Sequence, residues 1–163
     1  MATINFAVGL DPAALSEHSR DVVEHILDTS GNPSCTVTCL GRSPHEQAVV
    51  MRLNCIRNGV DEQMRTYLPP GQAVIQVFVA SKALNEADTI AAMEAEILRQ
   101  GPSKVSRHCG DQSVLQVLDI AQSSLRDVAA FEAVANGHAD LVSKCLDENR
   151  AVHIECPQPS VVT

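Results

Sequence analysis

Aromatic side chains are almost absent from this sequence, which has 163 residues but no Trp, one Tyr and three Phe. Proteins that hold single-stranded nucleic acid usually stack its bases on aromatic side chains, so such a platform is excluded. The formal net charge is −8 and no run of Lys or Arg offsets it, so the chain repels phosphate backbones. We therefore expect no nucleic-acid partner.

Long apolar runs and paired cysteine motifs are also missing. No apolar run approaches the roughly 20 residues that a membrane span requires, and residues 1–30 are interrupted by charged side chains, so we expect no membrane partner and no signal peptide. The six cysteines include no CxxC pair, and we expect reduced thiols. Cys35 and Cys39 are expected on one face of a strand about 13 Å apart, too far for a disulfide.

What is present is a large aliphatic fraction, since 45% of the residues are hydrophobic. A chain of this length with that composition predicts a single domain over 1–163, with a motif-bearing core at about 34–156 and a tail at 157–163. Hydrophobic periodicity and turn signals predict helices over 12–30, 44–58, 85–99 and a helical pair over 124–148, and strands over 34–40, 73–80, 104–108, 113–121 and 152–156. This order predicts an α+β fold in which helices flank a small, mostly antiparallel sheet.

Three polar residues occupy positions in the expected strands where alternation favours aliphatic side chains: His108, Asp119 and His153. A charge buried in a strand is costly unless it is paired or bound to a metal. If 104–108 and 113–121 form a hairpin, His108 and Asp119 lie on adjacent strands. Because hydrolytic zinc sites use three His or carboxylate ligands, the sequence predicts zinc bound by these three residues.

A general acid–base residue is expected beside this metal. Period-2 alternation places Glu155 on the same face as His153, with Val152, Ile154 and Cys156 on the other face. Its carboxylate can accept a proton from the attacking water and return it to the leaving amine. Glu148, at the end of the expected helical pair, is the competing candidate.

Three motifs together resemble a known family: GRSPHEQA at 41–48, SRHCGDQSVLQVLDIA at 106–121 and VHIE at 152–155. They are similar to the D-alanyl-D-alanine carboxypeptidase-like zinc peptidases, which share the lysostaphin and hedgehog signalling domain fold. The resemblance implies that His108, Asp119 and His153 hold zinc, that Arg42 binds a substrate carboxylate or backbone carbonyl, and that Ser106 contacts substrate. The chain departs from the family pattern because ten residues separate His108 from Asp119 and because no acid stands two or three residues before His153.

The function expected from these residues is zinc-dependent hydrolysis of an amide bond in peptidoglycan stem peptides, by a carboxypeptidase or an endopeptidase. The alternative is a catalytically inactive binding or structural domain on the same fold. We expect a monomer that acts at the bacterial cell wall, in the periplasm or outside the cell, with a delivery or immunity protein as a further partner.

Other interpretations of these residues remain open. Cys109 or Cys156 can form a nucleophilic pair with His108 or His153. Arg42 can be a surface residue paired with Glu46 one helical turn later. The segment 131–149 resembles one ankyrin helix pair, which would suit an adaptor rather than an enzyme.

Overall fold

The computed structural model describes residues 2–159 and consists of two compact units. The first, here called the sheet unit, contains the chain up to Gly41 and again from Asp111 onward. The second, here called the helical unit, is Arg42–Gly110. The expected single domain therefore consists of two bodies, one of which is inserted into the sequence of the other.

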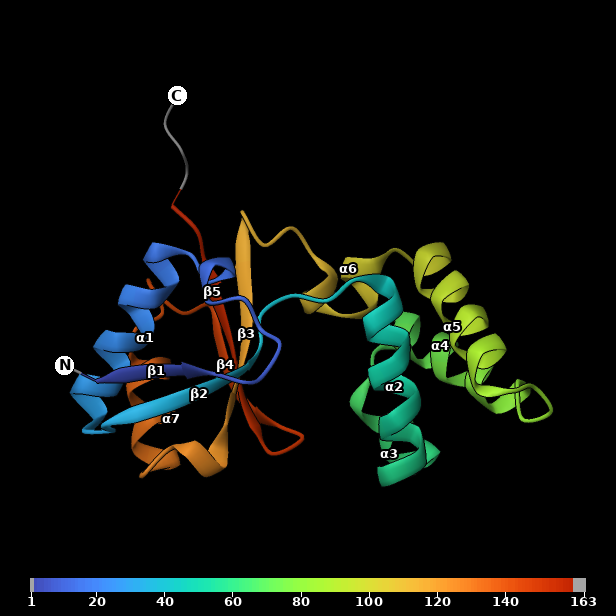
Figure 1. Ribbon diagram of the computed structural model, residues 1–163, viewed down its shortest axis with the longest axis horizontal. Coiled ribbons are helices and arrows are strands. Elements are labelled where there is room, and N and C mark those ends of the chain that lie inside the picture. Colours follow the sequence, from blue (N-terminus) through green and yellow to red (C-terminus); the bar gives the residue numbers. More distant parts are fainter. Residues whose placement is uncertain (1, 160–163) are drawn as a thin grey trace. The chain divides into compact units, whose positions relative to one another are not determined.

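The sheet unit contains a five-stranded sheet whose strand order is β1-β2-β3-β5-β4 (Figure 1). Its strands are β1 (Thr3–Phe6), β2 (Ser34–Cys39), β3 (Leu115–Ala121), β4 (Lys144–Glu148) and β5 (Ala151–Pro157). β1 pairs with β2 in parallel, and the other three pairings are antiparallel. The predicted α+β class is confirmed, and the small sheet is mixed, with mostly antiparallel pairings as expected.

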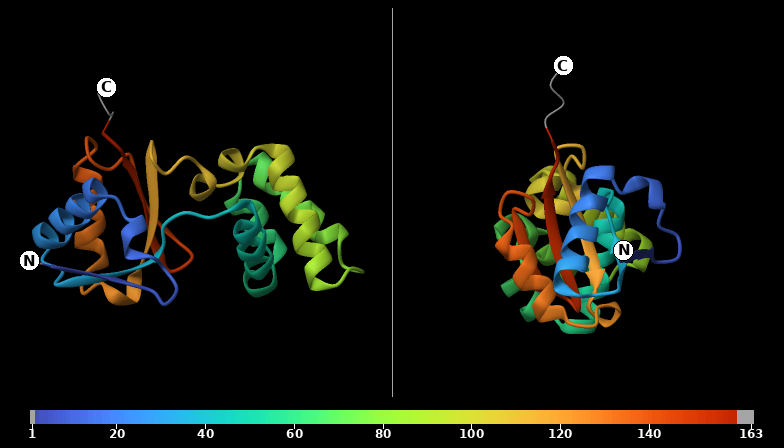
Figure 2. Two further views of the ribbon diagram at one scale, coloured as in Figure 1. Left: turned by 45° about the horizontal axis from the view of Figure 1, so that its top comes forward. Right: turned by 90° about the vertical axis from the view of Figure 1, so that its left-hand side faces the viewer.

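Two helices bury one face of this sheet, α1 (Glu17–Ser30) and α7 (Val128–Gly137) (Figures 1 and 2). Their apolar side chains pack on alternate residues of the strands, in a core that includes Val22, Ile26, Phe131, Val37, Leu118, Ile120, Val152 and Ile154. The predicted helix over 12–30 is split, because Asp11 caps a short 3-10 turn before Ser16 caps α1. One face of the sheet is therefore buried in the core of the sheet unit.

The helical unit has its own core. Its helices are α2 (Pro44–Asn58), α3 (Val60–Thr66), α4 (Pro69–Ala80), α5 (Glu86–Gln100) and α6 (Pro102–Val105), followed by a 3-10 turn at Arg107–Cys109. The core side chains are aliphatic or sulfur-containing: Ala48, Met51, Cys55, Val74, Ile75, Ile90, Met93, Ile97 and Val105. The two ends of the unit meet, since the backbone N–H of Arg42 donates to the carbonyl of His108 at 2.9 Å.

Two predicted strands in the helical unit are wrong. Residues 73–80 belong to α4, which begins at Pro69-Pro70 and buries Gly71, Val74 and Ile75 at helical spacing. A short apolar run is ambiguous between strand and helix, and here packing against α5 decides it. Residues 104–108 lie in α6 and the 3-10 turn, so the predicted hairpin with 113–121 does not form.

The predicted helical pair over 124–148 is half right. Its first part is α7, but its second part is the edge strand β4, which pairs with β5 through a turn at Asn149 and Arg150. The resemblance of 131–149 to an ankyrin helix pair is therefore wrong, and Glu148 ends a strand rather than a helix. β1 and α3 were not anticipated from the sequence.

Candidate functional site

A β-bulge near the end of β2 determines which residues face one another across the sheet. Val37 pairs with Ile120, whereas Cys39 pairs with Asp119, so one extra residue of β2 is accommodated between the two pairs. Cys35 and Val37 point into the core, and Cys39 shares the opposite face with Asp119. The prediction that Cys35 and Cys39 lie on one face is wrong because the bulge interrupts the alternation.

Three side chains form a row across β2, β3 and β5, because Cys39 stands opposite Asp119 and Asp119 opposite His153. Oδ1 of Asp119 lies 3.1 Å from Nδ1 of His153, and Nε2 of His153 lies 3.4 Å from Oε1 of Glu155. The prediction that Glu155 shares a face with His153 is confirmed, since Val152, Ile154 and Cys156 lie in the core instead.

The charges in this row are buried. The side chains of Asp119, His153 and Glu155 are 15%, 8% and 7% exposed. Burial lowers the pKa of His153, but the carboxylates of Asp119, Glu148 and Glu155 together raise it above its usual value. The three carboxylates therefore favour the protonated, cationic form of this imidazole.

Within the described residues, Cys39, His108 and Asp119 form a group that can hold a metal ion, with one ligand atom from each within 4.8 Å of the others. His108 is 5% exposed and lies in the 3-10 turn Arg107–Cys109. Thiolate sulfur, imidazole nitrogen and carboxylate oxygen are all zinc donors, so the residues fit that metal. Two of the three were predicted from the sequence, and Cys39 was not.

Arg42 is held within the helical unit by a buried amide. Its Nη1 donates to Oε1 of Gln47 at 3.2 Å, and Nε2 of Gln47 donates to the hydroxyl of Tyr67 at 3.3 Å. Glu46, the partner suggested for a surface ion pair, accepts from the backbone N–H and hydroxyl of Ser43, and these bonds, together with the charge of Arg42, lower the pKa of its carboxyl. The side chain of Gln47 is fully buried, so its hydrogen bond holds the guanidinium of Arg42, two residues before α2, in place.

The remaining predicted site residues are placed by their elements. Glu148 ends β4 and is close enough to His153 to raise its pKa. Ser106 belongs to the helical unit, between α6 and the 3-10 turn, where its carbonyl accepts from the N–H of Cys109. The roles of both residues stay predictions.

The geometry does not favour a cysteine nucleophile at Cys109 or Cys156. Burial raises the pKa of each thiol to about 11, so both are protonated at neutral pH. Cys156 also lies on the core side of β5, whereas His153 lies on the other side. Neither residue offers the thiolate that such chemistry requires.

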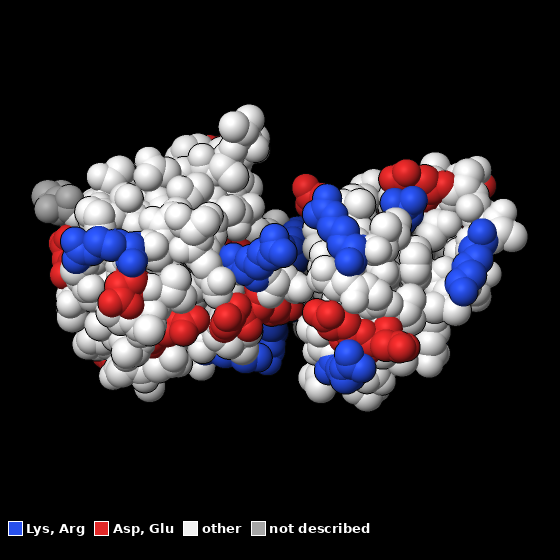
Figure 3. All heavy atoms as spheres, turned by 90° about the horizontal axis from the view of Figure 1, so that it is seen from below, with Lys and Arg blue, Asp and Glu red and all other residues white. Residues whose placement is uncertain are grey.

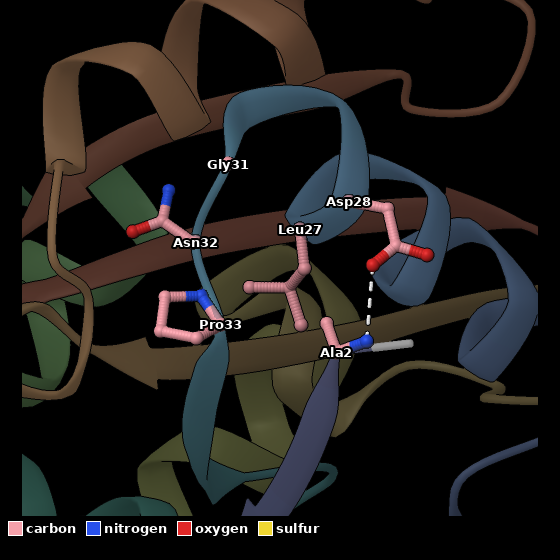
Figure 4. A pocket seen from close by; sticks show the side chains of 6 residues that line it. All are labelled: Ala2, Leu27, Asp28, Gly31, Asn32 and Pro33. Atoms are coloured by element: carbon pink, nitrogen blue, oxygen red, sulfur yellow. Dashed lines mark hydrogen bonds between the residues drawn. The ribbon is translucent and has the colours of Figure 1, made fainter.

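Two other surface features of the described residues carry no set of catalytic or metal-binding groups. A shallow pocket at the end of α1 is lined by Ala2, Leu27, Asp28, Gly31, Asn32 and Pro33 (Figure 4). Its carboxylate, on Asp28, accepts from the backbone N–H of Ala2 at 3.0 Å, so the pocket gathers no set of metal or catalytic groups. On the face shown in Figure 3, Lys and Arg are interspersed with Asp and Glu rather than gathered into a basic patch.

None of the described helices combines the length and the apolar character needed to cross a membrane. Comparison of the chain with protein-family models, curated proteins and solved structures found no match. The resemblance to zinc peptidases therefore rests on the three motifs alone. What the structure adds is the α+β fold and a Cys-His-Asp group that can hold a metal ion.

Proposed function

We propose that this chain is a zinc-dependent hydrolase that cleaves an amide bond in peptidoglycan stem peptides. The observation that carries the proposal is the buried row of Cys39, Asp119 and His153 in the sheet unit. The hydrolytic chemistry is supported by a carboxylate, Glu155, beside this row. The choice of substrate rests on the motif resemblance.

In this proposal His108 and Asp119 are two zinc ligands, and the third comes from the row that contains Cys39 and His153. Zinc, when bound, supplies Lewis-acid chemistry by polarising a carbonyl and making water more acidic. Glu155 accepts the proton of the attacking water and delivers it to the leaving amine, and Glu148 is the alternative base. Arg42 binds the carboxylate or a backbone carbonyl of the peptide through its planar guanidinium.

The second candidate function is a catalytically inactive binding or structural domain that keeps the metal. It is favoured by the contact of Glu155 with His153, because that contact occupies the proposed base. The two candidates predict the same metal content and differ in turnover. The proposed place of action is the bacterial cell wall, with a delivery or immunity protein as a partner.

The test combines metal analysis with a peptidoglycan digest. We expect the wild-type chain to bind one zinc ion and to release stem-peptide fragments or D-alanine, and we expect His108→Ala and Asp119→Ala to lose both. Asp147→Ala, an exposed carboxylate on β4, is the matched control and keeps both. Zinc without turnover supports the binding domain, and the absence of zinc binding overturns both candidates.

A further inference from the structure

We propose that the free edge of β1 binds an extended, basic peptide segment of a partner protein, which adds to the sheet as an antiparallel strand. This inference concerns the sheet unit alone and is independent of the proposed zinc site. Three features support it: the unprotected edge of β1, the direction of its backbone groups, and the acidic side of α1 next to the strand. Together they define the kind of peptide that fits.

The two edges of the sheet differ in how they are protected. β4 carries charged side chains at Lys144, Asp147 and Glu148, whereas β1, with the sequence TINF, carries none. Charged residues on an edge strand discourage other chains from pairing with it. β1 also contains neither a proline nor a bulge, and it pairs with β2 without interruption from Thr3 to Phe6. The outer edge of β1 is therefore open to strand addition (Figure 1).

The backbone of β1 directs alternate residues to its two sides. The N–H groups of Thr3 and Ala7 donate to backbone carbonyls of the neighbouring segment 33–37, at 3.0 and 2.9 Å. Because alternate residues of a strand face the same neighbour, the N–H and carbonyl groups of Ile4 and Phe6 point away from the sheet. Each of these two residues can exchange a pair of hydrogen bonds with an added antiparallel strand.

The helix α1 lies beside β1 and runs in the opposite direction. The guanidinium of Arg20 lies 5.8 Å from the centre of the Phe6 ring, and Oδ1 of Asp28 accepts from the N–H of Ala2 at 3.0 Å (Figure 4). The helix rises about 12 Å between Arg20 and Asp28, and the strand extends about 13 Å between Ala2 and Phe6. The helix therefore follows the strand along its length.

The solvent-facing side of α1 is acidic. It carries four carboxylates at helical spacing, on Glu17, Asp21, Glu24 and Asp28. Successive carboxylates are about 5.5 Å apart along the helix axis, close to the roughly 6.7 Å between side chains on one face of a strand. A peptide with Lys or Arg at every second position matches this spacing.

The charge of the sheet unit also argues against a second copy of this chain as the occupant. The unit contains thirteen Asp or Glu residues and four Lys or Arg residues. A second copy would bring an equally acidic unit to the edge, and the two would repel each other. A basic peptide is attracted instead.

The direction of the backbone groups determines which peptide residues must be basic. In an antiparallel pair, residues that exchange hydrogen bonds lie opposite each other, and their side chains project to the same face. The side chains of Ile4 and Phe6 pack on the core side of the sheet, which α1 covers. The peptide residues bonded to them therefore project toward the α1 side, and these are the positions for Lys or Arg.

The experiment is a titration of the full-length chain with a short fluorescent peptide in which Lys alternates with Thr, followed by fluorescence anisotropy. We expect binding that weakens as salt is added. Methylation of the Lys backbone nitrogens removes the donors that face β1 and lowers the affinity at least about 10-fold, as expected for the loss of several hydrogen bonds. Methylation of the Thr backbone nitrogens leaves the affinity unchanged. Absence of binding, or any other pattern between the two methylated peptides, overturns the inference.

Matched variants of the protein test the edge and the acids separately. Ile4→Pro removes an outward-facing N–H and abolishes binding, whereas Ile4→Val keeps both the N–H and the binding. Glu24→Gln and Asp28→Asn each weaken binding by about 2- to 5-fold, the range for an exposed ion pair. Asp147→Asn, on the opposite edge strand, is the control and leaves the affinity unchanged. Equal effects of Asp28→Asn and Asp147→Asn overturn the assignment to β1.

Amide NMR of the wild type with the same peptide removes any dependence on how a variant folds. We expect the N–H signals of Ile4 and Phe6 to shift and to gain protection from hydrogen exchange. The absence of changes at these two amides, or changes centred on β4, overturns the inference. A peptide-free dimer that Ile4→Pro dissociates, measured by analytical ultracentrifugation, assigns the edge to a second copy and also overturns it.

Discussion

Asp119 and His153 lie directly opposite each other on β3 and β5, with Oδ1 of the carboxylate 3.1 Å from Nδ1 of the ring. Both side chains are mostly buried, so removing Asp119 takes one hydrogen bond from a largely desolvated imidazole. We expect Asp119→Ala to lower the free energy of unfolding of the metal-free protein by about 1–3 kcal/mol, the range for losing a buried hydrogen bond to a charged group. Urea unfolding of the wild type and the variant in the presence of a chelator measures this difference in the free energy of unfolding.

The control for Asp119→Ala is Asp147→Ala on the edge strand β4, where the carboxylate is exposed. That substitution should change the free energy of unfolding by no more than about 0.5 kcal/mol. Equal effects of the two variants would show that the contact of Asp119 with His153 contributes nothing to the stability of the sheet unit.

The capping box of α2 predicts a pH dependence of stability. The backbone N–H and then the hydroxyl of Ser43 hydrogen-bond to Glu46 and lower its pKa. Because the folded-state pKa is below the unfolded one, Glu46 stabilises the fold above the unfolded pKa and loses this contribution as pH falls through the folded pKa. Glu46→Gln should therefore be less stable than the wild type at pH 7, and the two should converge in acid, as thermal unfolding at several pH values would measure.

The Ser43→Ala variant tests the other half of this box. Loss of the N-cap hydroxyl should cost about 1 kcal/mol, and in this background Glu46→Gln should have a smaller effect because one of its donors is gone. If Glu46→Gln has the same effect with and without Ser43, the carboxylate stabilises α2 through the helix dipole rather than through the cap.

Two buried glutamines in the helical unit should respond oppositely to the same substitution. Gln47 is bonded at both ends of its amide, whereas both amide atoms of Gln63 have no hydrogen-bond partner within the described residues. Gln63→Leu removes two unsatisfied atoms and should stabilise the protein by about 1–3 kcal/mol. Gln47→Leu removes the hydrogen bonds of this buried amide to Arg42 and Tyr67 and should destabilise the protein by a similar amount. Chemical denaturation measures the free energy of unfolding of both variants. Destabilisation of both would show that internal water satisfies the amide of Gln63.

The sequence predicted those elements whose signals are local. The capping box starts α2, Asn85 caps α5 and alternation marks β2 and β5, as expected. α4 was missed because Val and Ile favour strands in isolation, and the preference is overridden by packing in a separate helical core. β4 was missed because its pattern is too short to distinguish it from a helix end.

The candidate site was predictable to a similar extent. Asp119 and His153 were recognised because they interrupt apolar strands, and the structure places them in contact. Cys39 was overlooked because regular alternation assigns it to the core, and a bulge leaves no signal in a single sequence. His108 was identified for a strand that does not form, and it lies in a 3-10 turn instead.

The turn between β4 and β5 offers a stabilising substitution. Asn149 and Arg150 both have positive φ, 52° and 68°, which a two-residue hairpin of this kind requires at both positions. Arg150 carries a Cβ that disfavours this conformation by roughly 1–2 kcal/mol, whereas Gly adopts it freely. Arg150→Gly creates the preferred Asn-Gly turn and should raise the free energy of unfolding by about 1 kcal/mol. The backbone hydrogen bond from Gln122 to the carbonyl of residue 150 is retained.

Arg150→Ala separates the backbone effect from the loss of the long charged side chain. Alanine removes the charge but keeps a Cβ, so its stability should stay within about 0.5 kcal/mol of the wild type. Thermal unfolding of Arg150→Gly and Arg150→Ala under the same conditions compares their stabilities. If alanine stabilises as much as glycine, relief of charge or side-chain ordering is responsible, and the left-handed conformation of residue 150 costs the fold nothing.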